Sequence, residues 1–180
     1  ITLKDLLSNR SKLLRQKNAI KQTLGELKVS NDKTTQLLLE NLNKAALDGL
    51  KTSIKLIESE MLRLVKQDDA VSANYNRMIT VPGIGKITAI FIICCTNNFA
   101  IKITGKQLAN YTGVVPHEHK SGTSVKGRNR VHFMANKELK AILTMGALSA
   151  ISAYPEFKDY YNRKINEGKK LLSTILFFKT

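Results

Sequence analysis

The residues best suited to chemistry lie in one glycine-rich, basic segment, residues 114–131. Within it Ser121 precedes Gly122, and a glycine lets another molecule approach the backbone closely. A serine hydroxyl can act as a nucleophile in strand transfer when nearby cations stabilise the developing charge. The neighbouring cations are Lys120, Lys126, Arg128 and Arg130. From the residues alone, the same pattern also fits a phosphate contact without catalysis, or a solvated surface loop.

The sequence predicts no metal centre. His117 and His119 are spaced like a ligand pair, but no third and fourth ligands follow at a suitable distance. Cys94 and Cys95 stand in an apolar helical pattern, and adjacent cysteines do not easily reach disulfide geometry. We therefore interpret them as buried apolar residues. The carboxylates of residues 71–180 are too scattered for two-metal phosphoryl chemistry, so no cofactor is expected in this chain.

A second phosphate-binding pattern is the run VPGIGK, residues 81–86, between two helical patterns. Gly83 and Gly85 permit a tight turn and close approach of a ligand. A helix that begins at Lys86 would direct its first N–H groups and the positive end of its dipole toward an anion. This pattern is typical of the helix-hairpin-helix element, which holds the DNA backbone without reading its sequence. A plain corner between packed helices is the alternative.

The charge distribution indicates the partner. The chain has a formal net charge of +15; residues 1–70 contribute 13 cations and 9 anions, and residues 71–180 contribute 16 and 5. The C-terminal part is therefore expected to bind a polyanion, and the expected partner of this kind is DNA. The longest strongly apolar run, residues 89–95, is too short to span a bilayer, and no leader segment is recognised. A cytoplasmic location without membrane contact is expected.

The N-terminal part is predicted to be a helical hairpin. Helical patterns cover residues 3–28 and 35–66 with a polar turn between them, and Thr2 with Asp5 resembles a capping box. The apolar stripe of the second helix is Leu39, Leu42, Ala46, Leu50, Ile54, Ile57, Met61 and Leu64. Steps of three and four residues are typical of a coiled coil, so residues 1–69 are expected to form a domain that makes a homo-oligomer. Partial disorder is the alternative.

The C-terminal part is predicted to be a second helical domain, residues 70–180. Its expected helices cover residues 70–79, 86–95, 106–111, 135–153, 155–166 and 170–178. Residues 114–131 are expected to form a loop, because they show almost no helical pattern. No strand alternation is recognised anywhere, so the expected class is all-α.

Several motifs in this order resemble one family over about residues 75–165. They are VPGIG at 81–85, QLANYTGVVP at 107–116, KSGTS at 120–124 and NKELKAIL at 136–143. The family is that of insertion-sequence transposases with an N-terminal RuvC-like DEDD domain and a C-terminal helix-hairpin-helix transposase domain. Its members are described as bridge-RNA-guided, serine-dependent recombinases. The sequence departs from the family pattern at Ala135, where glycine is usual, and at Lys140, where arginine is usual and would bind a phosphate with a planar fork.

The resemblance implies a specific role for Ser121. The family's Ser-Gly step matches Ser121-Gly122, so Ser121 would attack a DNA phosphate and form a phosphoserine link; Ser124 is the fallback. The divalent metal would be held by the RuvC-like domain, which these 180 residues do not contain, so the isolated chain is expected to be inactive. A guide RNA is a further implied partner.

The sequence therefore predicts the DNA-binding and strand-transfer domain of a mobile-element transposase. The expected DNA contacts are Gly83, Gly85, Lys86, Lys120, Lys126, Arg128 and Arg130. One alternative is a non-catalytic nucleic-acid-binding module that shares only the helix-hairpin-helix element. Another is a structural coiled-coil protein, against which the uneven charge argues.

Overall fold

The computed structural model describes residues 2–29, 33–100, 103–114, 117–121, 125–131 and 133–168. For residues 27–29, 117–121 and 125–130 only the backbone is described. The chain divides into two compact units, Ile1–Ser72 and Ala73–Thr180. The predicted all-α class is confirmed, since seven helices make up most of the described part of the chain.

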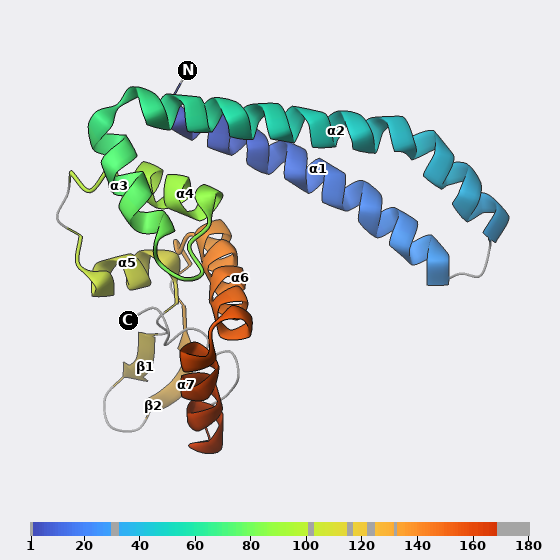
Figure 1. Ribbon diagram of the computed structural model, residues 1–180. Helices are drawn as coiled ribbons and strands as arrows, with labels where there is room; N and C mark the ends of the chain where they lie inside the picture. The colour runs from blue at the N-terminus through green and yellow to red at the C-terminus, as the bar shows by residue number, and fades with distance from the viewer. Residues whose placement is uncertain are drawn as a thin grey trace. The chain divides into compact units, whose positions relative to one another are not determined.

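The first unit is built from two long helices that pack along each other, α1 (Leu3–Val29) and α2 (Lys33–Gln67) (Figure 1). They run antiparallel because the connection between them spans only a few residues. At the start of α1, the backbone N–H of Thr2 donates to Asp5 (2.9 Å) and the Asp5 N–H donates to the Thr2 hydroxyl (3.3 Å). These contacts form the expected capping box. The Thr2 hydrogen bonds hold the pKa of Asp5 below its usual value.

The seam between the two helices differs from the predicted stripe in its first half. Ile54 and Met61 are buried as expected, but Leu42 is 67% exposed and Ala46 also faces solvent. The half-buried positions over this stretch are Leu39, Asn43, Leu47 and Leu50, together with Glu40 next to Leu39. The predicted stripe (39, 42, 46, 50) and the observed stripe (39, 43, 47, 50) both advance in steps of three and four residues, so periodicity cannot distinguish them. The Asn43 amide fits the seam because it donates to the Leu39 carbonyl (2.9 Å).

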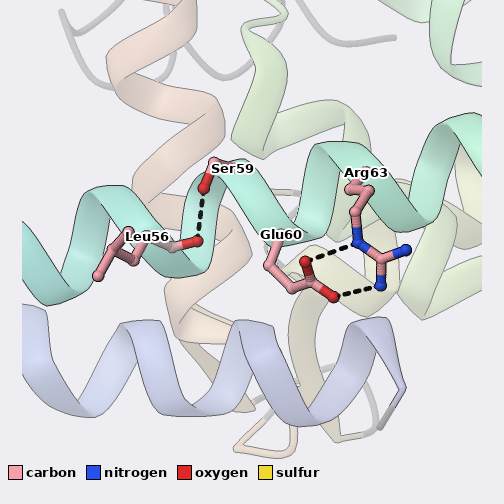
Figure 2. Close-up of polar contacts among 4 residues, drawn as sticks. All are labelled: Leu56, Ser59, Glu60 and Arg63. Atoms are coloured by element: carbon pink, nitrogen blue, oxygen red, sulfur yellow. Dashed lines mark hydrogen bonds and ion pairs between the residues drawn. The ribbon is translucent and has the colours of Figure 1, made fainter.

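A partly buried ion pair joins the two helices. Arg10 Nε donates to Glu58 Oε1 of α2 (2.7 Å), and only 15% of the Arg10 side chain and 33% of the Glu58 side chain are exposed. A contrasting pair lies on the exposed surface of α2, where Arg63 binds Glu60 through two nitrogens (2.6 and 2.8 Å) (Figure 2). Partly buried pairs are screened less by solvent than exposed ones.

Replacing Arg10 with alanine should lower the free energy of unfolding by about 1–2 kcal/mol, because Glu58 would keep its half-buried place without its cation. Arg63→Ala is the matched control and should leave the unfolding midpoint nearly unchanged, since that pair is exposed. Urea unfolding followed by helical circular dichroism measures both variants. Equal losses of stability would contradict the structural role of the Arg10–Glu58 pair.

The second unit contains most of the third helix and all of the elements that follow it. These are α3 (Asp69–Ile79, whose first residues precede the division), α4 (Lys86–Thr96), α5 (Gly105–Thr112), β1 (His117–Ser121), β2 (Val125–Arg130), α6 (Lys137–Ala153) and α7 (Pro155–Asn166). Helix α4 forms the core, because its sequence is apolar on nearly every face and its residues 88–93 are buried. Helix α6 packs on α4, α5 and α7. The predicted helix at residues 170–178 lies outside the described residues.

Residues 114–131 do not form the predicted loop throughout, since they contain a β-hairpin. Strands β1 and β2 are antiparallel, with Ser121 opposite Val125 and Lys120 opposite Lys126. Between the pairs His119–Gly127 and His117–Arg130, β2 holds one more residue than β1, which marks a bulge. The prediction failed because these strands are rich in polar residues. They lack the alternation of apolar and polar residues that identifies a half-buried strand.

Candidate nucleic-acid interface

The glycine turn joins two helices and leaves the start of the second one open. Helix α3 ends at Ile79 and α4 begins at Lys86. Gly85 and Lys86 are exposed, and Gly85 caps α4 in extended conformation without any side-chain hydrogen bond. The first hydrogen bond of the helix runs from the Ala89 N–H to the Gly85 carbonyl (3.0 Å). The preceding N–H groups of α4 therefore have the arrangement that binds anions at helix N-termini.

Gly83 has a packing role that the sequence did not reveal. Its φ of +83° lies in the left-handed region, and a Cβ on it would lie 2.5 Å from the Gly146 carbonyl oxygen in α6. A Cβ on Gly146 would in turn clash with the Gly83 carbonyl. The two backbones touch, so neither position can hold a side chain without displacement. A Cβ on Gly85 would meet nothing within 4 Å, which makes Gly85 the more accessible of the two predicted DNA contacts.

The inner side of the turn borders an apolar cavity of about 280 Å³. Pro82 and Ile84 line it from the turn, Leu108 from α5, Ala147 from α6 and Phe157 from α7. A side-chain amide of α3 also holds the α3–α4 pair, because Asn74 Nδ2 donates to Asn98 Oδ1 just beyond α4 (2.9 Å). The backbone contact between Gly83 and Gly146 thus fixes the turn on its inner side, while Gly85 and Lys86 remain at the surface.

The β-hairpin carries the other predicted site residues. Lys120 and Ser121 are the last residues of β1, and Lys126, Arg128 and Arg130 all lie on β2. Ser121 forms the pair nearest the connecting residues 122–124, so the fold places it at the end of the hairpin. Lys120 and Lys126 occupy directly opposite positions, where like charges cost stability unless an anion is present. The fallback nucleophile Ser124 lies outside the described residues.

The return from the hairpin to α6 is held by α5. Gly113 ends α5 with φ +66°, and a Cβ on it would lie 2.5 Å from both Val131 Cγ1 and Ala135 Cβ. The Asn136 N–H donates to the Tyr111 carbonyl (2.9 Å), and Asn136 Oδ1 accepts the Leu139 N–H (2.9 Å) as the cap of α6. These contacts were not predicted, although a helix-capping asparagine and a glycine after a helix are signals that could have found them.

Tyr111 completes this junction through its side chain. Its hydroxyl accepts from Asn136 Nδ2 (3.3 Å) and lies 3.7 Å from Cys95 Sγ. The Asn136 hydrogen bond acts to lower the pKa of Tyr111, but burial and the Cys95 contact outweigh it, so the pKa is raised. The phenol therefore stays protonated at neutral pH and can keep its donor role toward Cys95.

Neither a metal cluster nor a membrane span is found in the described part of the chain. Cys94 and Cys95 are half-buried rather than buried, and no disulfide joins them. No three His, Cys, Asp or Glu side chains gather among the residues whose side chains are described. None of the described helices is long and apolar enough to cross a bilayer.

Comparison with known families identifies the class of protein that this unit resembles. Residues 75–162 match the family described as transposase IS116/IS110/IS902. The match begins within α3, ends within α7, and includes both the glycine turn and the β-hairpin. The resemblance predicted from the motifs thus finds independent support over nearly the same residues.

Individual curated proteins are also similar to this chain. A pilin gene-inverting protein of Moraxella bovis is 28% identical over 118 residues, covering 65% of this chain and 37% of that protein. An uncharacterized 43.6 kDa protein of insertion element IS110 from Streptomyces coelicolor is 25% identical over 130 residues, covering 67% and 32%. A probable family 20 transposase of Pseudomonas aeruginosa is 26% identical over 117 residues, covering 63% and 34%. The chain spans about a third of the length of these curated relatives.

Proposed function

We propose that this chain is the DNA-binding and strand-transfer part of a mobile-element transposase, with Ser121 as its nucleophile and Ser124 as the fallback. One observation carries the proposal. The segment similar to a transposase family contains a basic β-hairpin with Ser121 at its end, and an exposed helix N-terminus at Lys86. Both features suit phosphate groups, and their compact unit provides the scaffold.

In this proposal the helix-hairpin-helix turn and the β-hairpin bind different phosphates of the DNA. Gly83, Gly85 and Lys86 contact the DNA backbone, while Lys120, Lys126, Arg128 and Arg130 hold the phosphate that is attacked. The Ser121 oxygen loses its proton and bonds to phosphorus as one P–O bond to a deoxyribose breaks. The released sugar oxygen takes up a proton, so the phosphodiester passes to the serine without oxidation or reduction. The cations stabilise the charge on the transferring phosphate.

Other partners belong to the proposal as well. A divalent metal would be supplied by a RuvC-like domain outside these 180 residues, and its chemistry would activate the attacking and leaving oxygens. A guide RNA, a cytoplasmic location and a homo-oligomer formed through α1 and α2 remain predictions. In support of the last, α2 exposes Leu37, Leu38, Leu42 and Leu56, which pairing with α1 leaves uncovered.

The alternative is a nucleic-acid-binding module without catalysis. It uses the same two elements, since both the turn and the basic hairpin can hold phosphates without any nucleophile. The two functions agree on DNA binding and differ only in whether Ser121 forms a covalent bond.

DNA binding should be largely independent of sequence and should weaken steeply with salt. Contacts to about four to eight phosphates give a slope of roughly −4 to −7 when log affinity is plotted against log salt concentration. Fluorescence anisotropy with a labelled duplex measures this slope.

The Lys86→Gln variant should reduce the magnitude of that slope by about 1, because one phosphate contact is lost. Lys51→Gln in α2 is the matched control, since Lys51 pairs with Asp48 (2.8 Å). An unchanged slope for Lys86→Gln would show that the N-terminus of α4 does not contact the DNA. A chain that does not bind DNA at all would refute both candidate functions.

A further inference from the structure

The turn between β2 and α6 exposes two large apolar side chains. Phe133 is 83% exposed and Met134 is 73% exposed, the highest values among the large hydrophobic residues that the structure describes. Single exposed apolar residues are common on protein surfaces, whereas two adjacent ones in a basic stretch of sequence form a small apolar surface that is accessible to a binding partner. No step of the proposed strand transfer uses either of them.

Contacts with α5 and Gly113 hold this turn at both of its ends. Val131 before it and Ala135 after it both pack against the backbone of Gly113, and Asn136 is bound to the Tyr111 carbonyl. A turn held at both ends loses little freedom when its side chains enter a partner, so more of the contact energy contributes to binding. Tyr111 adds a half-exposed aromatic ring at the same junction, with its hydroxyl bound to Asn136.

The charge of the neighbouring sequence indicates what the partner is. Residues 125–140 contain the cations Lys126, Arg128, Arg130, Lys137 and Lys140 and one anion, Glu138. A second copy of the chain that met this turn about a twofold axis would bring the same excess of cations against itself. A polyanion avoids this repulsion, and duplex DNA offers both phosphates for the cations and stacked bases for apolar side chains.

We propose that Phe133 and Met134 form an apolar wedge that enters a base step of duplex DNA and partly unstacks it. Apolar side chains inserted between bases are a known way in which proteins open and kink a duplex. The wedge lies at the stem of the hairpin that carries Ser121, so an opened step would lie beside the backbone that the hairpin holds. This inference deepens the proposed function and depends on DNA binding.

The wedge predicts a preference for DNA that is already weakly stacked. A duplex with one mismatched pair should bind the chain on the order of tenfold more tightly than the paired duplex of the same sequence, because less unstacking energy is spent. Phe133→Ser combined with Met134→Ser should abolish this preference. The matched control combines Met145→Ser with Leu148→Ser, two exposed apolar residues on α6, and should keep it.

The measurement is competition anisotropy with the two duplexes, with 2-aminopurine beside the mismatch to report unstacking and circular dichroism to verify folding. Steep salt dependence without any preference in the unaltered chain would overturn the wedge and leave the proposed function standing. Absence of binding to either duplex would overturn both. If the Phe133/Met134 variant kept the preference but changed the mass measured by light scattering, the turn would be an interface between copies instead.

Discussion

Replacing Ser121 with alanine in a protein that also carries the RuvC-like domain is expected to abolish the covalent protein–DNA adduct. The Ser121 hydroxyl oxygen is the proposed nucleophile that bonds to phosphorus, so its loss stops the reaction rather than slowing it. DNA affinity should fall by about tenfold at most, because one neutral hydrogen bond contributes about 0.5–1.5 kcal/mol. Denaturing gel electrophoresis of trapped complexes measures the adduct, and anisotropy measures the affinity.

Ser124→Ala is the matched control, since this serine lies three residues away in the same basic segment. It should leave the adduct intact. The reverse result, with the adduct lost only in Ser124→Ala, would move the nucleophile to the fallback residue. Normal recombination by both single variants would show that the hairpin is a phosphate clamp. The 180-residue chain alone should bind DNA and form no adduct.

The second large effect is expected at Gly146. An alanine there would press its methyl group into the Gly83 carbonyl, and neither backbone can move without shifting α6 or the glycine turn. Overpacking of this kind costs about 1–3 kcal/mol or more. Urea unfolding should therefore show a clear loss of stability, and DNA affinity should fall with it because the turn is displaced.

Gly49→Ala in α2 is the control for this experiment. A Cβ at Gly49 meets nothing within 4 Å, and alanine in a helix is favoured over glycine by about 0.5–1 kcal/mol. This variant should be slightly more stable than the original chain. If Gly146→Ala had the same stabilising effect, the close contact between the two backbones would be wrong. Gly85→Ala is the cleaner probe of DNA contact, because that position is open.

The helices of this protein were predictable because their signals are local. The pattern predicted helices at residues 70–79 and 86–95, and the structure has Asp69–Ile79 and Lys86–Thr96. Helical hydrogen bonds and side-chain contacts join residues three or four apart, so composition and spacing within one segment carry the information. The basic segment with Ser121 is recognisable for the same kind of reason, since its chemistry depends on residue type.

Other features depended on residues that are distant in the sequence. The β-hairpin arises from backbone pairing of two polar strands, which leaves no apolar alternation to detect. Leu47 rather than Ala46 faces α1 because packing of two helices selects between two equally spaced stripes.

Gly83 and Gly146 show the same division between sequence and tertiary structure. The sequence marked Gly83 as a turn residue, and its positive φ agrees with that role. Only the tertiary structure shows that Gly83 touches Gly146, 63 positions later, so that each requires the other to lack a side chain. Sequence periodicity cannot predict such a contact, because the contact forms only when α6 packs against the turn.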